Sequence, residues 1–218
     1  MAHRSAWCRI VYTRSPRIRT SGGSDRIFGV NTYSHAFFTW ALARYGFRAS
    51  RKAALCGAAG AALPDVPAFA GTAYYVGLPF LRDGWASMSS PEVLEAIYFT
   101  GPFGTAGTLL HSAVPVGMLL ALYGLLQLRR RDRQKMLLWF LIGWAGHAVT
   151  DFLTHVEDSR PLFWPLSGWE WSSPVSYWNP AYYGREFFLI EHGLMLLILA
   201  WIAFRWTWSR AKPREKAR

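Results

Sequence analysis

The sequence has few cysteines and few acidic residues. Its two cysteines, Cys8 and Cys56, lie far apart and match no zinc or redox spacing, so neither a disulfide framework nor a cysteine-based metal site is expected. Only 13 acidic residues stand against 24 Lys and Arg, which gives a formal net charge of +11. These basic residues form no recognisable nucleic-acid-binding motif and lie beside apolar runs, so we expect no nucleic-acid partner.

Apolar side chains dominate the composition. The chain is 52% hydrophobic and 17% aromatic, which is rich for a soluble protein of 218 residues. Five apolar segments cover residues 30–47, 53–76, 106–128, 135–154 and 186–208. A helix of about 20 apolar residues crosses the ~30 Å of bilayer hydrocarbon. We therefore predict an all-α fold, a polytopic membrane helix bundle of about five transmembrane helices. It would form a single domain over residues 30–208, with the lipid bilayer as partner.

The second apolar segment contains small residues and two prolines. Gly57 and Ala61 are four residues apart, a spacing that lets two membrane helices approach closely. Pro64 and Pro67 predict a kink or an end of this helix, because proline removes a backbone hydrogen bond and clashes with the preceding turn.

Lysine and arginine predict the orientation in the membrane. They concentrate in the connection after the first segment, in the RRRDRQK connection at residues 129–135 and in the C-terminal SRAKPREKAR, whose residues 209–218 would form a basic cytoplasmic tail. The two long connections, residues 77–105 and 155–185, contain only Arg82, Arg160 and Arg185 as basic residues. By the positive-inside rule the N-terminus of the bundle lies outside and the C-terminus inside the cell.

Residues 1–29 do not fit this orientation. They carry six arginines and one aspartate and lack the apolar core of a signal peptide. Two interpretations stay open: a basic disordered tail, or a start assigned too early, with Val30 as the true first residue. Mass spectrometry of the native N-terminus distinguishes them.

The sequence GHAVTDFLTH places three polar residues in an apolar run. His147, Asp151 and His155 are four residues apart, so they share one face of a helix. Histidine and carboxylate together suit zinc or another divalent first-row metal. With a rise of 1.5 Å per residue, His147 and His155 are about 12 Å apart and cannot bind one ion, whereas His147 and Asp151 are about 6 Å apart. We therefore pair His147 with Asp151 and leave His155 for a second ion, for orienting a ligand or for proton transfer.

Further ionisable residues fall toward the same end of the predicted bundle, and we expect them to meet in one polar pocket because such residues are costly in lipid. They are His35, Asp65, His111, Glu191 and His192. Each has a structural alternative: Asp65 follows Pro64 and can cap a broken helix, and His111 with Ser112 can pack inside a helix. A single histidine near a helix end is more often an interfacial residue than a ligand.

The order of the motifs SHAFF, LPD, LLHS and GHAVTDFLTH, followed by RPLFWPLS and SPVSYW, resembles the predicted membrane-bound metal-dependent hydrolases of bacteria, of the LexA-regulated inner-membrane type. The similarity extends over most of residues 30–205. It implies a bacterial inner-membrane metallohydrolase with five metal ligands: His35, Asp65, His111, His147 and Asp151. Many members have a second Asp and a His where this chain has residues 66–69, and a further His within residues 104–110. These departures argue against a two-metal site.

The two long connections supply candidates for substrate binding. Residues 155–185 are rich in Trp, Tyr and Pro, which suits the headgroup layer of the membrane, and an aromatic belt without other function is the simpler interpretation. Arg160 and Arg185 are the cations of this connection that can bind a phosphate. In SSPEVLEAIYF, Ser90 is an expected N-cap and Pro91 the first residue of a short surface helix.

Two classes of function remain. In the first, a bound divalent metal, preferably zinc, lowers the pKa of a water molecule toward ~7, and an ester or phosphoester of a lipid-like substrate is hydrolysed. Glu191 would then act as the base or orient a ligand histidine, and His155 would transfer protons. In the second class the protein is a non-catalytic metal or haem binder or a carrier. A carrier needs a polar path to the inner side, which the cytoplasmic halves of the last three segments lack, so the hydrolase is favoured.

Overall fold

The computed structural model describes residues 31–83 and 90–211. Within these ranges the protein is helical and contains no strand, which confirms the predicted all-α class. The first 29 residues, whose nature the sequence left open, lie outside the described residues. So does most of the basic C-terminal tail.

Among the described residues, three helical segments are long and apolar enough to cross a membrane, and there are four if one bent pair counts as a single span. This number is roughly consistent with the five predicted helices. The first apolar segment forms a shorter helix, α1 (Thr32–Ala41), extended by the π-helical turn Leu42–Gly46. Along α9 (Gly184–Ala211), no residue of the most apolar stretch is buried in the isolated chain, as expected for a helix in contact with lipid.

The second span runs from Arg51 to Arg82 and is interrupted at the predicted prolines. It consists of α2 (Arg51–Ala62), the 3-10 turn Leu63–Asp65, α3 (Val66–Thr72), the π-helical turn Ala73–Gly77 and α4 (Leu78–Asp83). Pro64 lies in the 3-10 turn, because its ring and its missing N–H prevent a regular α-helical turn there. The interruption therefore places Asp65 at a change of helical geometry.

The third segment differs from the predicted continuous helix over residues 106–128. It forms α6 (Gly101–His111) and α7 (Ala113–Leu125), which are bent by 50° at Ser112. Ser112 has an extended backbone, and its hydroxyl accepts a hydrogen bond from the N–H of Val114 as an N-cap. The same hydroxyl lies 2.9 Å and 2.6 Å from the carbonyl oxygens of Leu162 and Trp164. His111 and Ser112 thus lie at a break and not inside a helix.

Close contact between α2 and α8 (Met136–Thr154) forms the centre of the bundle. A Cβ atom on Gly60 would overlap the carbonyl of Phe140, and one on Gly143 would overlap the carbonyl of Gly57. These glycines let the two backbones touch, which confirms the close approach predicted from Gly57 and Ala61. The contact brings the second half of α8 beside the interruption at Asp65.

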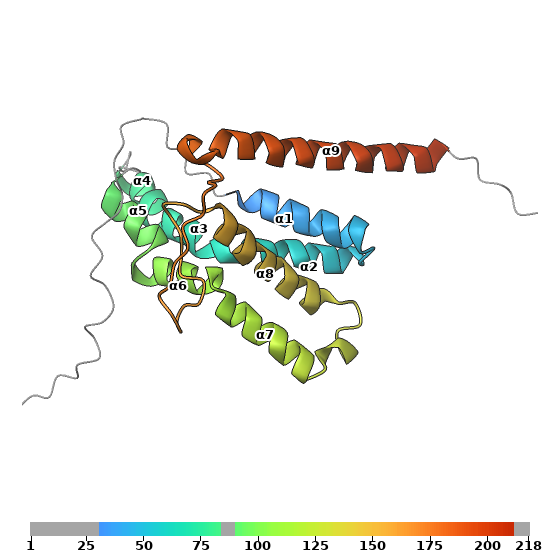
Figure 1. Ribbon diagram of the computed structural model, residues 1–218, viewed down its shortest axis with the longest axis horizontal. Helices are drawn as coiled ribbons and strands as arrows, with labels where there is room; N and C mark the ends of the chain where they lie inside the picture. Colours follow the sequence, from blue (N-terminus) through green and yellow to red (C-terminus); the bar gives the residue numbers. More distant parts are fainter. Residues whose placement is uncertain (1–30, 84–89, 212–218) are drawn as a thin grey trace, which may run out of the picture.

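The remaining elements gather at one end of the bundle. The predicted surface helix is α5 (Pro91–Tyr98), capped by Ser90, whose hydroxyl accepts from the N–H of Val93. The connection from α8 to α9 contains the short 3-10 turn Pro180–Tyr182 and folds back on α8, where the N–H groups of Ser173 and Tyr177 donate to His155 and Thr154. Figure 1 shows the α1–α2 connection, the α7–α8 connection with the 3-10 turn Leu128–Arg130, and the C-terminal end of α9 together at the opposite end.

Candidate metal centre

Five side chains from four parts of the chain meet where the Pro64 interruption faces α8. His35 comes from the first turn of α1, Asp65 from the interruption, His111 from the last residue of α6, and His147 and Asp151 from α8. We call these five residues the His/Asp cluster. All but His35 are buried, and His147 is only 1% exposed. The structure therefore brings together all five residues that the sequence suggested as metal ligands.

The ligating atoms of the cluster lie within a few ångströms of one another. The Nε2 atom of His147 is 3.1 Å from Asp151 Oδ2, and the Nε2 atom of His111 is 3.2 Å from the same oxygen. Asp65 Oδ1 lies 3.4 Å from His111 Nε2 and 3.7 Å from His147 Nε2. His35 Nε2 is 3.2 Å from Asp151 Oδ1. Ligands that share one ion at bond lengths of about 2.0–2.2 Å have similar mutual separations, about 3–3.5 Å.

Hydrogen bonds fix the orientation of two of these histidines. His111 Nδ1 lies 2.7 Å from the carbonyl oxygen of Gly107, and His147 Nδ1 lies 2.7 Å from that of Ala61. A carbonyl only accepts, so both Nδ1 atoms must carry the proton, and in a neutral ring Nε2 is then an acceptor. The histidine ligands of metal sites are usually oriented in the same way, with the second ring nitrogen donating to a carboxylate, a backbone carbonyl or a water.

The consequence is a convergence of acceptors. The Nε2 atoms of His111 and His147 are 3.2 Å apart and face the oxygens of Asp65 and Asp151. A proton on one imidazole would satisfy some of these contacts, whereas a divalent cation would satisfy all of them. Two overlapping groups have the geometry of a metal site, His35 with His147 and Asp151, and Asp65 with His111 and His147. Because His147 belongs to both, the donor set fits one nitrogen- and oxygen-ligated ion.

Asp65 is oriented by a residue that the sequence did not single out. The hydroxyl of Thr32 donates to Asp65 Oδ2 over 2.6 Å, which leaves Oδ1 directed at the histidines. Asp65 makes no capping hydrogen bond at the start of α3, so the structural alternative of a helix cap is not supported. Thr32 precedes His35 by three residues on α1. One turn of this helix therefore contributes His35 to the cluster and Thr32, which orients Asp65.

A cavity of about 80 Å³ adjoins the cluster. Its wall includes four of the five cluster residues, and beyond them it is lined by side chains from α1, α5, α9 and the α8–α9 connection: Asn31, Tyr98, His155, Asp158, Arg160, Tyr177 and Glu191. The cavity is small beside the ~300–1,000 Å³ of pockets for drug-sized ligands, so it suits a headgroup and not a whole lipid.

His155 lies between two carboxylates at the edge of this cavity. Its Nε2 is 3.4 Å from Asp151 Oδ2 and its Nδ1 is 3.1 Å from Asp158 Oδ2. Burial opposes the charged form, but the two aspartates outweigh it and raise the pKa of His155 to about 10. Burial alone would raise the pKa of Asp158, but the adjacent His155 outweighs this effect, so the pKa is lowered. His155 is thus closer to the cluster than its axial rise from His147 suggested, because it contacts the same carboxylate from the end of α8.

Glu191 lines the cavity and His192 does not, as expected for adjacent helical positions, although Glu191 Oε2 and His192 Nδ1 lie 3.7 Å apart. Glu191 Oε2 also accepts a hydrogen bond from Asn31 Nδ2 over 3.1 Å. Among the described residues, Glu191 forms no hydrogen bond or ion pair with the five cluster residues. The Nε2 of His192 is 2.6 Å from the hydroxyl of Tyr33, and its ring stacks on Phe188, outside the cavity.

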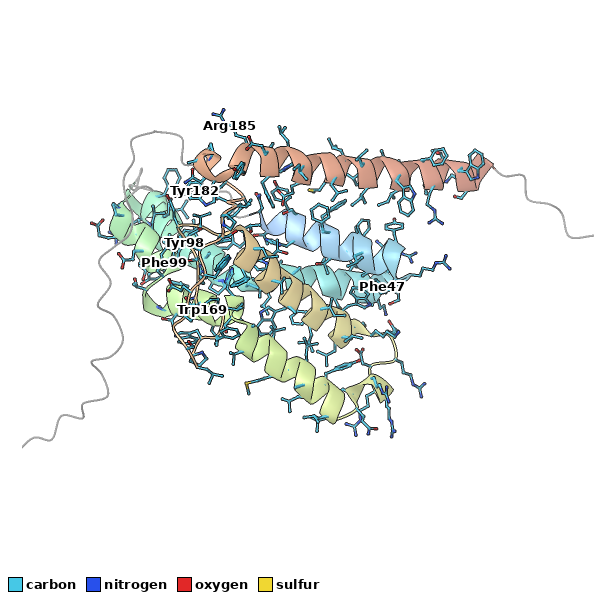
Figure 2. All side chains as sticks on the ribbon, in the orientation of Figure 1. Phe47, Tyr98, Phe99, Trp169, Tyr182 and Arg185 are labelled. Carbon is cyan, nitrogen blue, oxygen red and sulfur yellow. The ribbon has the colours of Figure 1, made fainter. Side chains whose placement is uncertain are left out.

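The two arginines suggested for substrate binding lie in different places. Arg160 lines the cavity and is partly buried, and its pKa is lowered by burial despite nearby aspartates. Arg185 is exposed at the start of α9 and does not line the cavity; in Figure 2 it projects from this helix on the side away from the bundle. The structure thus places Arg160 on the wall of the same cavity as the cluster and Arg185 outside it.

The sequence did not indicate Asn31, Thr32, Asp158 or Tyr177 as parts of this site. Asp158 and Tyr177 lie in the α8–α9 connection, whose path no periodic pattern predicts. Spacing does offer a signal for Asp158, three residues after His155. Burial strongly raises the pKa of Tyr177, so its hydroxyl stays protonated and available as a donor.

Comparison with known proteins gives a family but no individual relative. A family profile described as YdjM inner membrane protein matches residues 31–211, most of the chain. No curated protein and no solved structure matches it. The family description agrees with the expected location in the bacterial inner membrane and says nothing of a metal or a reaction.

Proposed function

The chain belongs to the YdjM inner membrane protein family, and from this premise we propose that it is a membrane-embedded metal-dependent hydrolase with an outward-facing site. The single observation that carries the proposal is the pair of oriented histidines, His111 and His147, whose Nε2 atoms face each other and two carboxylates. We infer a divalent metal at this point, preferably zinc, because imidazole and carboxylate ligands suit it.

We propose that the site faces outward. All three basic segments, the α1–α2 connection, the α7–α8 connection and the end of α9, lie at the end of the bundle away from the cluster (Figure 1). Lysine and arginine near membrane helices remain on the cytoplasmic side. The N-terminus of the bundle would then lie outside and the C-terminus inside.

The residues would have distinct roles in hydrolysis. The His/Asp cluster would hold the metal, which when bound supplies a water of lowered pKa and polarises the scissile group. Glu191 lines the same cavity and, among the described residues, forms no hydrogen bond or ion pair with the cluster, a position that suits a base accepting a proton from water. His155, held between Asp151 and Asp158, would hold a proton for the leaving group.

A lipid-like substrate fits the surroundings of the site. We expect the small polar cavity to bind a headgroup. Exposed aromatic and aliphatic side chains such as Trp169, Trp171 and Leu166 of the α8–α9 connection lie at the same end and suit the membrane interface. The cavity has no room for a porphyrin, which argues against a haem between these histidines.

Metal analysis combined with hydrolysis assays tests the proposal. The full-length protein, purified in detergent, is expected to retain about one divalent ion per chain and to hydrolyse an ester or phosphoester from a panel of lipids. A protein that binds metal but hydrolyses no member of a broad panel would favour the non-catalytic metal-binding alternative. A protein without metal, even after incubation with zinc, would refute the metal site itself.

A further inference from the structure

Arg160 has an unusual environment for a partly buried cation. It forms no ion pair with a carboxylate of the described residues, and the aspartates that act on its pKa do so from a greater distance. Within the described part of the chain its one hydrogen bond, from Nη1 to the hydroxyl of Thr108, is 3.5 Å long, and its guanidinium lies 5.7 Å from the centre of the Phe99 ring. A guanidinium has five N–H donors, and a buried one without acceptors is costly. Most of these donors are therefore available to a ligand in the cavity.

The position of Arg160 relative to the metal centre is fixed by α6. Gly107 has no side chain, and a Cβ atom there would lie 2.9 Å from Arg160 Nη1, so the guanidinium packs against this turn of the helix. The carbonyl of the same glycine accepts the hydrogen bond from His111 Nδ1. One residue thus touches Arg160 and orients a ligand of the cluster, which places the guanidinium beside the metal centre on the wall of the same cavity.

A second unsatisfied group lines this cavity. Asp158 Oδ1 is buried and has no hydrogen-bond partner within the described part of the chain, while Oδ2 contacts His155. An unsatisfied donor set and an unsatisfied acceptor in one cavity, with no ion pair between them, indicate a polar ligand that bears both an anionic group and a hydrogen-bond donor.

We infer that Arg160 binds the phosphoryl oxygens of the substrate, so that the hydrolase acts on a phosphoester of a membrane lipid headgroup and not on a carboxylic ester. Arginine binds phosphate through two parallel N–H bonds, and Asp158 Oδ1 would accept a hydrogen bond from a hydroxyl or ammonium group of the headgroup. In the reaction the oxygen of water bonds to phosphorus, the phosphorus–oxygen bond to the alcohol breaks, and the alcohol leaves with a proton from water. This inference rests on the proposed function for the reaction, but the anion site is testable alone.

Binding of inorganic phosphate to the full-length, zinc-loaded protein is the direct test, measured by calorimetry. Arg160→Gln is expected to weaken phosphate binding by about 10-fold or more, since charge-assisted hydrogen bonds are lost, with Arg160→Lys between it and the original protein. Arg205→Gln is the matched control, because Arg205 also lies over an aromatic ring, Trp201, but far from the cavity. Zinc content should be equal in all variants.

Substrate preference gives an independent readout. Arg160→Gln should slow hydrolysis of 4-nitrophenyl phosphate by a much larger factor than any hydrolysis of 4-nitrophenyl acetate, which has no anionic group. Equal phosphate affinity in the original protein and in folded Arg160→Gln would overturn the inference; Arg160→Lys answers the same question if Arg160→Gln does not fold. Zinc binding with acetate hydrolysis but no affinity for phosphate would overturn the inference and leave the proposed hydrolase intact. Arg160-dependent phosphate binding without hydrolysis of any substrate would support the anion site and overturn the proposed hydrolase.

Discussion

The Nε2 atoms of His111 and His147 lie 3.2 Å apart although both Nδ1 atoms are committed to backbone carbonyls. These carbonyls, of Gly107 and Ala61, belong to α6 and to the end of α2, so the orientation of each ring is built into the helices around it. Two lone pairs directed at each other in a buried site are unfavourable unless a cation lies between or beside them. The fold therefore presents a cation-binding arrangement before any ion is considered.

Removal of a ligand should remove the metal. We expect His147→Ala and Asp151→Ala to weaken metal binding by more than the roughly 10–100-fold typical of residues that only orient ligands. Metal content after gel filtration, measured by mass spectrometry, checks this. His192→Ala is the control, because His192 contacts Tyr33 and lies outside the cavity. Full occupancy in both ligand variants would rule out the site.

Thr32 should matter for the metal although it is not a ligand. Thr32→Val keeps the shape of the side chain and removes the hydroxyl that donates to Asp65 over 2.6 Å. We expect a loss of about 10-fold in metal affinity, measured by competition with a chelator. Thr72→Val should leave the affinity unchanged, because the hydroxyl it removes is bonded, among the described residues, only to the carbonyl of Ala68 in its own helix. Equal losses in the two variants would indicate a general effect of the substitution.

The contact between α2 and α8 should be sensitive to a single methyl group. Gly143→Ala places a Cβ atom against the carbonyl of Gly57, where neither backbone can move away freely, and should destabilise the protein by about 1–3 kcal/mol. Gly146→Ala, in the same helix with nothing within 4 Å of the added atom, is the control. Thermal unfolding in detergent compares them. Loss of metal is also expected in Gly143→Ala, because this contact positions His147 beside Ala61.

A sequence predicts those parts of the site that depend on residues close together in the chain, and it misses those that depend on distant ones. The shared face of His147 and Asp151 depends only on the geometry of one helix, so their spacing predicted it. The interruption at Asp65 was predicted because proline acts on its own helix. The bend at Ser112 was not, since its hydroxyl contacts the carbonyls of Leu162 and Trp164, about 50 residues away.

Long-range contacts explain the other omissions. Thr32 acts through Asp65, and Asn31 through Glu191, 160 positions later, so no local pattern marks either residue. Arg160 and Arg185 were equivalent in the sequence as the two cations of one connection. The structure separates them because residues 155–164 fold against α6 and α7, whereas Arg185 begins the exposed helix α9.

The orientation in the membrane is testable by labelling. After replacement of the native cysteines, a cysteine at Gly168 should react with an impermeant thiol reagent added to intact cells, and one at Gln134 should react only after the membrane is opened. Both positions are exposed, so their difference reports sidedness and not burial. The reverse pattern would place the His/Asp cluster on the cytoplasmic side.

A substitution of Glu191 tests whether this residue acts as a base or only supports the site. Its carboxylate lines the cavity, accepts a hydrogen bond from Asn31 and, among the described residues, forms no hydrogen bond or ion pair with the cluster. Glu191→Gln keeps the size of the side chain and removes its ability to accept a proton. If Glu191 is the base, the variant should retain its metal and lose hydrolysis by about 100-fold or more.

Two outcomes would argue against this role. A parallel loss of metal in Glu191→Gln would indicate that the carboxylate supports the ligands after all, through a path such as Asn31 and the start of α1, which carries His35. Asn31→Ala then serves as the comparison, since it removes the same hydrogen bond and leaves the carboxylate in place. Under the base mechanism Asn31→Ala should be far more active than Glu191→Gln, because a carboxylate without its hydrogen bond still accepts a proton. Equal activity in the two variants would assign the effect to the hydrogen bond and remove Glu191 from the chemical step.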